Sequence, residues 1–386
     1  MATNTLGAYN PVFYANETLI HLRKVLGLAA RVHRGYELER NSFRRGDTIT
    51  VRKPATFSAQ AAPSSAQDLN TDSVNITLDQ WYEVKFELTD KERAYTGDVI
   101  IQEHIEPAAY ALADKVDQSL AGLYKNVPWV YDYASATDEA ILINSRKVLF
   151  DNAVPMNDNR LHMMVESTVE AYFLKLALFN SAQVTGGTAN QDALMRGALG
   201  TRFGVEVFSN QNTPTHTGGT ATQAAGDKGF TVTGAHAAGV TSIVLGGGTG
   251  TETIKAGDTF VIAGNTQRYA VTADTAVAAG AATVAITPKL AAALAGSEVV
   301  TFGTAPNDAA HSVNLMFHRN FAALALAPLS DDLPGIEAFT ASDPVSGLSV
   351  RARRFADGNN SKIIMALDAL WGHKVLDGNL AVRVST

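Results

Sequence analysis

The chain of 386 residues contains no cysteine. This absence excludes disulfide bonds, thiolate nucleophiles and cysteine-ligated metal sites, and it fits a reducing compartment. Long hydrophobic runs are missing too, because the longest nearly apolar stretch, residues 321–329, is far shorter than the ~20 residues of a membrane-spanning helix. The N-terminal residues lack the basic segment and apolar core of a secretory signal. We therefore expect a soluble protein that is made and used in the cytoplasm, with no membrane partner.

The motifs that mark common active sites are also absent from the sequence. The glycine-rich stretch 245–258 lacks the Gly-Lys-Ser/Thr of a phosphate-binding loop, so we interpret it as a turn between strands. There is no Gly-x-Ser-x-Gly elbow. The nine histidines form no His-Glu-x-x-His pair, which favours structural roles over a metal site. Asp331 and Asp332 are adjacent carboxylates, but a solvated turn before Pro334 explains them better than acid–base chemistry. We expect no enzyme activity, no metal and no cofactor.

Charge is sparse and slightly negative. Charged residues make up 18% of the chain and hydrophobic residues 46%, which is typical of a folded protein rather than a disordered one. The formal net charge of −7 argues against a dedicated nucleic-acid binder, which carries a basic surface. It leaves room for a protein with one face that meets nucleic acid loosely. The length suits one or two domains with appendages.

The first ninety residues predict an arm followed by an extended hairpin. A short amphipathic helix is expected where Leu19, Leu22, Leu26 and Ala30 recur at helical spacing. Residues 48–54 alternate as a strand, and residues 74–88 supply its partner. About twenty small and polar residues connect the two strands. Because two strands alone cannot bury a face, we expect a neighbouring subunit to cover this hairpin.

Helical and mixed patterns follow. Residues 98–125 carry an apolar stripe typical of a long helix, with a kink or two abutting helices expected at Pro107. Residues 137–152 predict a second helix, capped by Thr137. An alternating α/β section then begins with a buried strand at 160–166.

That section continues with a helix opened by a capping box of Ser167 and Glu170. A short helix at 190–197 and a strand at 202–210 complete it.

The composition changes at residue 213. Residues 213–304 hold 15 Gly, 20 Ala and 19 Thr but only nine charged residues. Short strands separated by glycine turns indicate a small barrel or sandwich, and Gly264-Asn265 is a hairpin signal. We expect six strands, near residues 229–233, 240–245, 258–263, 267–272, 282–287 and 298–302. We interpret the segment as an inserted β domain whose two ends lie close together.

Two charged stretches stand out after these elements are assigned. In "RARRF", Arg351 and Arg353 share one face of a strand, which is either solvated or a contact with acidic loops of another subunit. The stretch "TDKERAYTGD", residues 89–98, is either a solvated turn or an inter-subunit salt-bridge site. Both alternatives stay open for each stretch.

Several strings together resemble a known family. They are "TGAHAAGVTSIVL", "IKAGDTFVIAGNTQRYAV", "NLMFHRNFAALALAPL", "DPVSGLSVRARRF" and "ALWGHKVL". The chain resembles the major capsid proteins of tailed bacteriophages, and in particular the coat-protein family of short-tailed enterobacterial phages with an inserted β-barrel domain. The resemblance covers most of the chain and implies an α+β fold of the Johnson type, with an arm, an extended loop, a spine helix, and peripheral and axial domains.

The resemblance also implies a division of the chain into parts. These are an N-terminal arm (1–46), an extended hairpin loop (47–88), a peripheral domain with the spine helix (89–159), the first part of an axial domain (160–212), the insertion domain (213–304) and return strands of the axial and peripheral domains (305–386).

The implied function is a shell of hexamers and pentamers of this chain around packaged double-stranded DNA. It would be assembled in the host bacterial cytoplasm with a scaffolding protein and a portal protein, and would expand later. The negative subunit would contact the DNA only loosely. No Lys–Asn crosslink is assignable. Our candidate inter-subunit contacts are Arg52, Lys53, Asp68, Asp72, Asp90, Lys91, Glu92, Arg93, Arg351, Arg353 and Arg354.

Two other functions fit the sequence less well. An extracellular fibre or adhesin whose β domain binds glycan would need a secretion signal or a rod-forming pattern, and neither is visible. An enzyme with a β accessory domain would need a convergent polar cluster, and the motifs supply none.

Overall fold

The computed structural model describes most of the chain and divides it into two compact units. Unit 1 comprises Met1–Leu120 and Ala322–Leu376, and unit 2 comprises Ala121–Phe321 and Asp377–Thr386. The described residues are 27–34, 48–53, 72–89, 106–133, 140–181, 199–222, 229–248, 250–302, 310–332, 336–342, 349–357 and 362–385, together with 18, 59, 61–62, 66 and 197.

Unit 1 is built around one long strand, β22 (Lys362–Val375). One edge of β22 pairs antiparallel with β3 (Gln80–Thr89) over ten residues. Its other edge pairs with β21 (Ser349–Asp357) along the first half and with β19 (Ala322–Ala327) along the second half. β20 (Glu337–Ser342) pairs with β21 and completes the sheet. β3 and β22 are thus neighbours in the sheet although they lie far apart in the sequence.

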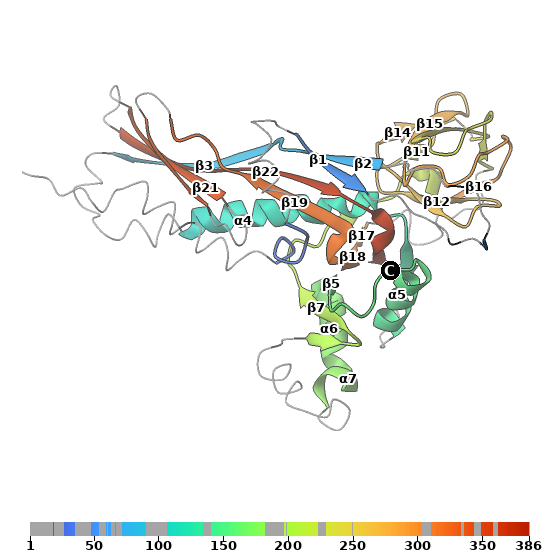
Figure 1. The fold of residues 1–386 in the computed structure, drawn as a ribbon, viewed down its shortest axis with the longest axis horizontal. Helices are drawn as coiled ribbons and strands as arrows, with labels where there is room; N and C mark the ends of the chain where they lie inside the picture. The colour runs from blue at the N-terminus through green and yellow to red at the C-terminus, as the bar shows by residue number, and fades with distance from the viewer. Residues whose placement is uncertain are drawn as a thin grey trace, which may run out of the picture. The chain divides into compact units, whose positions relative to one another are not determined.

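One face of this sheet is covered by α4 (Glu106–Ala121), which runs alongside the strands in Figure 1. The predicted stripe is buried at Ala109, Leu112, Val116 and Leu120. Trp371 of β22 is fully buried on this face, and its Nε1 donates to Ser119 Oγ at 3.1 Å. Pro107 lies in the first turn of α4, where backbone N–H groups have no partner within the helix, so proline is tolerated there. The expected kink involves residues 98–105, which lie outside the described part of the chain.

The opposite face carries the hairpin of β1 (Thr48–Lys53) and β2 (Asp72–Thr77), which pair antiparallel. Their apolar side chains Ile49, Val51 and Ile76 pack on alanines of β19. Gly372 of β22 lets the end of β2 approach so closely that a Cβ there would lie 2.2 Å from the Thr77 carbonyl oxygen. This corrects the expectation of a long hairpin covered by a neighbouring subunit. Only β1 and β2 form the hairpin, β3 leaves it to join β22, and the apolar face is covered by the same chain.

The N-terminal residues 27–34 attach to this unit through backbone bonds. His33 pairs with β19, donating to the Ala322 carbonyl at 3.1 Å and accepting from Leu324 N at 3.0 Å. Residues 27–32 are turns, and Ala30 is exposed, so the amphipathic helix predicted around residues 19–30 does not include this part. Leu19, Leu22 and Leu26 lie outside the described residues.

Buried Asp117 on α4 holds these turns in place. Its carboxylate accepts from the backbone N–H groups of Gly27, Leu28 and Ala29 at 2.8, 3.2 and 2.9 Å. Burial raises the pKa of Asp117 above its ordinary value, although the three N–H donors and Arg34 act in the opposite direction. The arm is therefore anchored by a desolvated carboxylate that three backbone donors satisfy.

Unit 2 contains a second sheet. Its strand order is β4 (Val130–Asp132), β23 (Ala381–Ser385), β18 (Asn314–His318), β5 (Leu161–Val165), β7 (Val205–Ser209) and β6 (Gly200–Arg202). β23 and β4 pair in parallel, as do β5 and β7, and the other pairs are antiparallel. β5 is the buried strand that the sequence predicts.

Three helices contribute to the core of this sheet: α5 (Ala140–Asp151), α6 (Ser167–Lys175) and α7 (Ala177–Asn180). α5 matches the predicted helix, while Thr137 lies outside the described residues. The capping box is wrong, because Ser167 is already the first helical residue and Glu166, at the N-cap, makes no side-chain cap. The strand predicted at 202–210 forms as β7 from Val205 to Ser209, while Arg202 belongs to β6, which pairs with β7 in a hairpin. Phe203 and Gly204 form its turn with φ of 49° and 73°, the left-handed backbone that such tight turns need. Of the helix predicted at 190–197, only Gly197 is described.

The six strands predicted between residues 229 and 302 all form, in one sheet. Their order is β16 (Val300–Phe302), β12 (Thr259–Ile262), β13 (Arg268–Val271), β15 (Ala282–Thr287), β10 (Ser242–Gly246) and β9 (Thr231–Val232). β12 and β13 form the hairpin expected at Gly264-Asn265.

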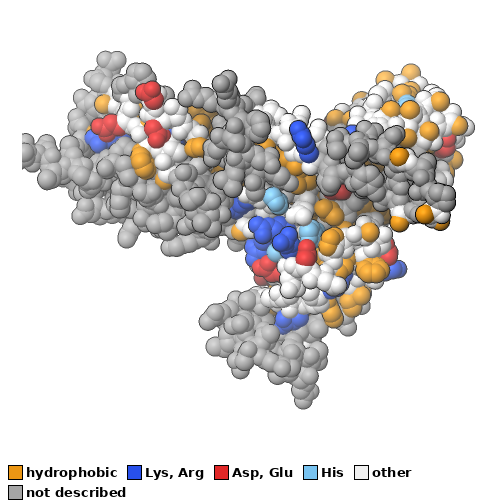
Figure 2. Space-filling model, in the orientation of Figure 1, with side chains coloured by type: hydrophobic (Ala, Val, Ile, Leu, Met, Phe, Trp, Pro, Cys, Tyr) orange, Lys and Arg blue, Asp and Glu red, His pale blue; other side chains and the backbone are white. Residues whose placement is uncertain are grey.

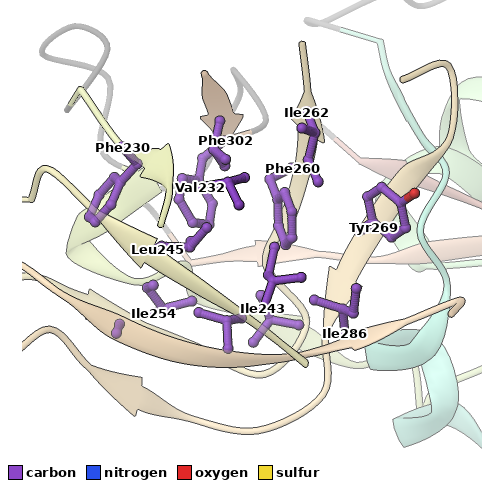
Figure 3. Close-up of a cluster of buried hydrophobic side chains, with 14 of the residues drawn as sticks. Phe230, Val232, Ile243, Leu245, Ile254, Phe260, Ile262, Tyr269, Ile286 and Phe302 are labelled. Atoms are coloured by element: carbon purple, nitrogen blue, oxygen red, sulfur yellow. The ribbon is translucent and has the colours of Figure 1, made fainter. Parts of the chain in front are cut away.

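The two outer strands meet, so the sheet closes into a barrel. Val232 N donates to Glu298 O, and Val300 N donates to Phe230 O, both at 2.9 Å. Side chains from facing strands, among them Phe230, Phe260 and Phe302, point into one shared interior (Figure 3). Every buried member of this core lies between Ala221 and Phe302.

Short elements complete unit 2. β8 (Thr215–His216) pairs with β17 (His311–Ser312) where the chain enters and leaves the barrel segment, so its two ends lie side by side. β11 (Thr253–Ile254) pairs with β14 (Thr275–Ala276). Single 3-10 turns occur at η4 (Gly122–Asn126), η5 (Thr220–Thr222), η6 (Arg319–Phe321) and η7 (Gly378–Leu380).

The chain passes from unit 1 to unit 2 after Leu120, and the buried side of α5 belongs to the core of the unit 2 sheet. The expected peripheral domain of residues 89–159 stays a prediction. Ile141 and Leu149 of α5 share this core with residues of β5 such as Met163. The naming of the parts as arm, loop, peripheral, axial and insertion domains remains a prediction.

Candidate assembly surface

The strand face that carries Arg351 holds a row of charged residues. In register, Arg351 of β21 lies opposite Asp368 of β22, which lies opposite Glu83 of β3. Arg351 donates from Nη2 to Asp368 Oδ2 at 2.6 Å and from Nε to Oδ1 at 3.1 Å. A third donor, Nη1, reaches Ser330 O at 2.8 Å. The side chains are 6% and 0% exposed, so this is a bidentate ion pair closed off from water.

Arg353 and Trp81 surround the same carboxylate. Arg353 Nη2 lies 2.5 Å from Glu83 Oε2 and 3.4 Å from Asp368 Oδ2. Trp81 Nε1 donates to Asp368 Oδ2 at 3.1 Å, while its ring stays 57% exposed. Burial raises the pKa of Glu83, but Lys85 and Arg353 outweigh it, so the pKa lies below its ordinary value. The predicted shared face of Arg351 and Arg353 is confirmed, and their partners are within the chain.

The remaining candidate residues divide into two groups. Arg354 lies 3.5 Å from Glu337 of the neighbouring strand, and Arg52 is exposed on β1. Lys53 and Asp72 are register partners at the ends of β1 and β2. The others, Asp68, Asp90, Lys91, Glu92 and Arg93, lie outside the described residues. For all these candidate residues, an inter-subunit role stays a prediction. The Arg351 side chain is almost completely buried within the chain, so little of its surface is available for such a contact.

A second polar cluster, which could not be predicted from the sequence, joins the barrel to the rest of unit 2. Arg383 of β23 donates to Val127 O from Nε and Nη2 at 2.8 and 2.6 Å, and to Gly257 O from Nη1 at 2.5 Å. Burial lowers the pKa of Arg383 to about 10, which leaves the guanidinium charged at neutral pH. His216 bridges Tyr124 and Asp258, each at 3.1 Å. The barrel is thus joined to its neighbours by buried polar bonds.

The other paired histidines support the structural reading. His318 Nε2 lies 2.7 Å from Asp158 Oδ2, and His162 Nδ1 lies 2.8 Å from Glu206 Oε2. Within the described ranges, no group of three or more His, Asp or Glu side chains is arranged to hold a metal ion. No described helix is both long and apolar enough to cross a membrane.

One cavity of about 630 Å³ opens at the carboxyl ends of the parallel strands β5 and β7. Its lining consists of two carboxylates and otherwise of hydroxyl and amide side chains. The residues are Glu166, Ser167, Glu170, Ser209, Asn210, Gln211, Thr213, Thr215 and Ser312. The sequence signal for it was present but weak, since Glu166 and Asn210 each follow directly after a buried strand.

Comparison with known proteins gives matches in structure only. No protein-family model matches the sequence, and no curated protein matches it. A chain from Mycobacterium phage Che8 is similar with a TM-score of 0.52 and 14% identity, covering 93% of this chain and 90% of that chain.

Two further solved structures are similar at lower scores. The capsid of Ralstonia phage GP4 has a TM-score of 0.45 and 11% identity, covering 93% of this chain and 88% of that one. The capsid of cyanophage P-SCSP1u has a TM-score of 0.45 and 11% identity, with 88% and 83% covered.

The likeness to the Che8 chain shows the fold. It confirms the predicted α+β class and the Johnson-type order of hairpin, long helix, central sheet with helices, and return strands.

Proposed function

We propose that this chain is a major capsid protein, whose copies form the closed icosahedral shell around the double-stranded DNA of a tailed phage. In this role the chain is structural rather than catalytic. The observation that carries the proposal is the fold shared with the phage Che8 chain over 93% of this chain. The strings that resemble phage coat proteins point to the same function.

The finer parts of the proposal concern partners and subfamily. A scaffolding protein and a portal protein join the assembly in the host cytoplasm, and the shell expands later. The net charge of −7 favours loose contact with packaged DNA over tight binding. The barrel of residues 229–302 has a core of its own, which supports an insertion domain of the kind found in short-tailed enterobacterial phages. The candidate contact residues Asp68, Asp90, Lys91, Glu92 and Arg93 are proposed to meet a neighbouring copy.

The proposal is tested by assembly of the purified chain. Negative-stain microscopy and sedimentation velocity would compare the chain alone with the chain co-expressed with its scaffolding protein. We expect rings, tubes or closed shells. A species that stays strictly monomeric at high concentration, with and without scaffold, would overturn the proposal.

A further inference from the structure

The two ends of strand β5 carry opposite charges. Arg160 stands directly before the strand and Glu166 directly after it. Six residue steps separate them, so they lie roughly 20 Å apart at about 3.3 Å per residue. β5 is central in a six-stranded sheet, between β18 and β7, so the separation is rigid.

The basic end consists of Arg160 and Arg319. Arg319 N donates to Arg160 O at 2.9 Å, which holds the two residues together at neighbouring strand ends. Both side chains are exposed, and neither guanidinium makes a hydrogen bond or ion pair with any residue that the structure describes. A neighbouring carboxylate, Asp158, is already engaged by His318 Nε2 at 2.7 Å and by the N–H of Arg160 at 3.2 Å. Figure 2 shows Lys, Arg and His side chains gathered where Figure 1 draws β18 and β5.

The acidic end is the cavity of about 630 Å³. Glu166 and Glu170 are half-buried in its wall, and their carboxylates have no hydrogen-bond or ion-pair partner among the described residues. None of the lining residues is Lys, Arg or His. The basic end is thus exposed apart from the already engaged Asp158, and the acidic end has no basic side chain among its lining residues.

We propose that these two ends are the halves of one contact between copies: Arg160 and Arg319 of one copy enter the cavity of the next and pair with Glu166 and Glu170. The partner is a second copy of this chain because both halves belong to every copy and their charges are complementary. Guanidinium groups bind carboxylates in pairs of parallel hydrogen bonds, which gives the contact a defined geometry. A head-to-tail contact between opposite ends of a rigid sheet builds a ring when the rotation closes. This inference rests on the proposed self-assembly and assigns residues to it.

Charge reversal tests the contact. One variant carries Arg160→Glu with Arg319→Glu, a second carries Glu166→Arg with Glu170→Arg, and a third carries all four changes. The control carries Lys125→Glu with Lys147→Glu, two exposed lysines of unit 2, and changes the net charge as much as the first variant. Sedimentation velocity and negative-stain microscopy measure assembly, and circular dichroism with thermal unfolding verifies the fold.

We expect the concentration needed for assembly to be at least tenfold higher for each of the first two variants. The variant with all four substitutions and the control should assemble like the wild type. A mixture of the first two variants should co-assemble by alternation, in six-membered rings but not in five-membered ones. The contact would be overturned if either double-substitution variant assembled like the wild type. It would also be overturned if the variant with all four substitutions folded but did not assemble. Normal assembly of Arg160→Glu/Arg319→Glu with loss of retained DNA would assign the arginines to nucleic acid instead. If the wild type itself does not assemble, it is the proposed function that fails.

Discussion

Replacing Gly372 with alanine should dislodge the hairpin β1–β2 from the sheet of unit 1. An added Cβ would lie 2.2 Å from Thr77 O, 2.8 Å from Thr77 C and 3.1 Å from Leu78 Cα. All three are backbone atoms, so no side-chain rotation relieves the overlap. Gly372 is itself paired with Ala325 of β19, which prevents β22 from moving away alone. The end of the hairpin must therefore shift by roughly 1 Å to restore a normal carbon–oxygen contact.

The size of the effect follows from two opposing contributions. Overpacking of a well-packed site costs about 1–3 kcal/mol. Replacement of glycine by alanine also restricts the unfolded chain, which regains about 0.4–1 kcal/mol. Gly122→Ala is the matched control, because its added Cβ has nothing within 4 Å and its φ is not positive. The control isolates the unfolded-state contribution, so the two variants should differ by about 1–3 kcal/mol, the cost of overpacking alone.

Urea unfolding measures the free energy of unfolding of both variants, and hydrogen exchange locates the change. In Gly372→Ala, the amides of β1 and β2 should lose protection first, while those of the barrel keep theirs. Equal stability of the two variants, with hairpin amides as protected as in the wild type, would show that the hairpin does not rest on Gly372.

Three further predictions concern charged side chains. Asp117→Ala removes the acceptor of the Gly27, Leu28 and Ala29 N–H groups, and each buried donor left unsatisfied should lower the free energy of unfolding by about 1–3 kcal/mol. Hydrogen exchange of these three amides that is as slow as in the wild type would contradict this. Asp368→Ala strands the buried Arg351 and should cost about 3–5 kcal/mol, whereas Arg351→Met with Asp368→Leu should cost less; urea unfolding ranks them, and the reverse order would refute the buried pair. The hydrogen bond from Ala256 N–H, and next the one from Lys255, hold the pKa of Asp274 below its ordinary value. Asp274 therefore stabilises the fold at pH values above its unfolded pKa of about 3.9, and the stabilisation is lost as the pH falls through the lower pKa of the folded state. The stability gap between wild type and Asp274→Asn should therefore be present at pH 6 and vanish in acid; a gap that persists at pH 2 would exclude this origin.

Local patterns predicted the elements whose signal is contained in a few residues. The six barrel strands were placed correctly because each is a short alternating run bounded by glycine turns. The stripe of α4 and the buried strand β5 were visible for the same reason. The shared face of Arg351 and Arg353 also followed from strand alternation, which is a local property of the backbone.

Pairing between distant segments could not be predicted in the same way. Residues 74–88 read as one continuous strand, yet β2 pairs with β1 and β3 pairs with β22, because the partner of a strand edge depends on which segments the fold brings together. Asp368 stands in the apolar run "ALDAL", where no neighbouring residue reveals the arginines that neutralise it. The capping box at Ser167 and Glu170 failed because β5 extends to Val165, which places the N-cap one residue earlier, at Glu166.

The sequence by itself determined where strands and helices form, which faces are apolar, and that cysteine chemistry is absent, since these depend on residue type and on spacing within one element. Only the tertiary structure decided that the hairpin is covered by the alanines of β19, that the barrel closes between β9 and β16, and that Arg319 lies against Arg160. These facts join residues tens to hundreds of positions apart, and the energy that selects such pairs comes from burial and hydrogen bonding in the complete fold.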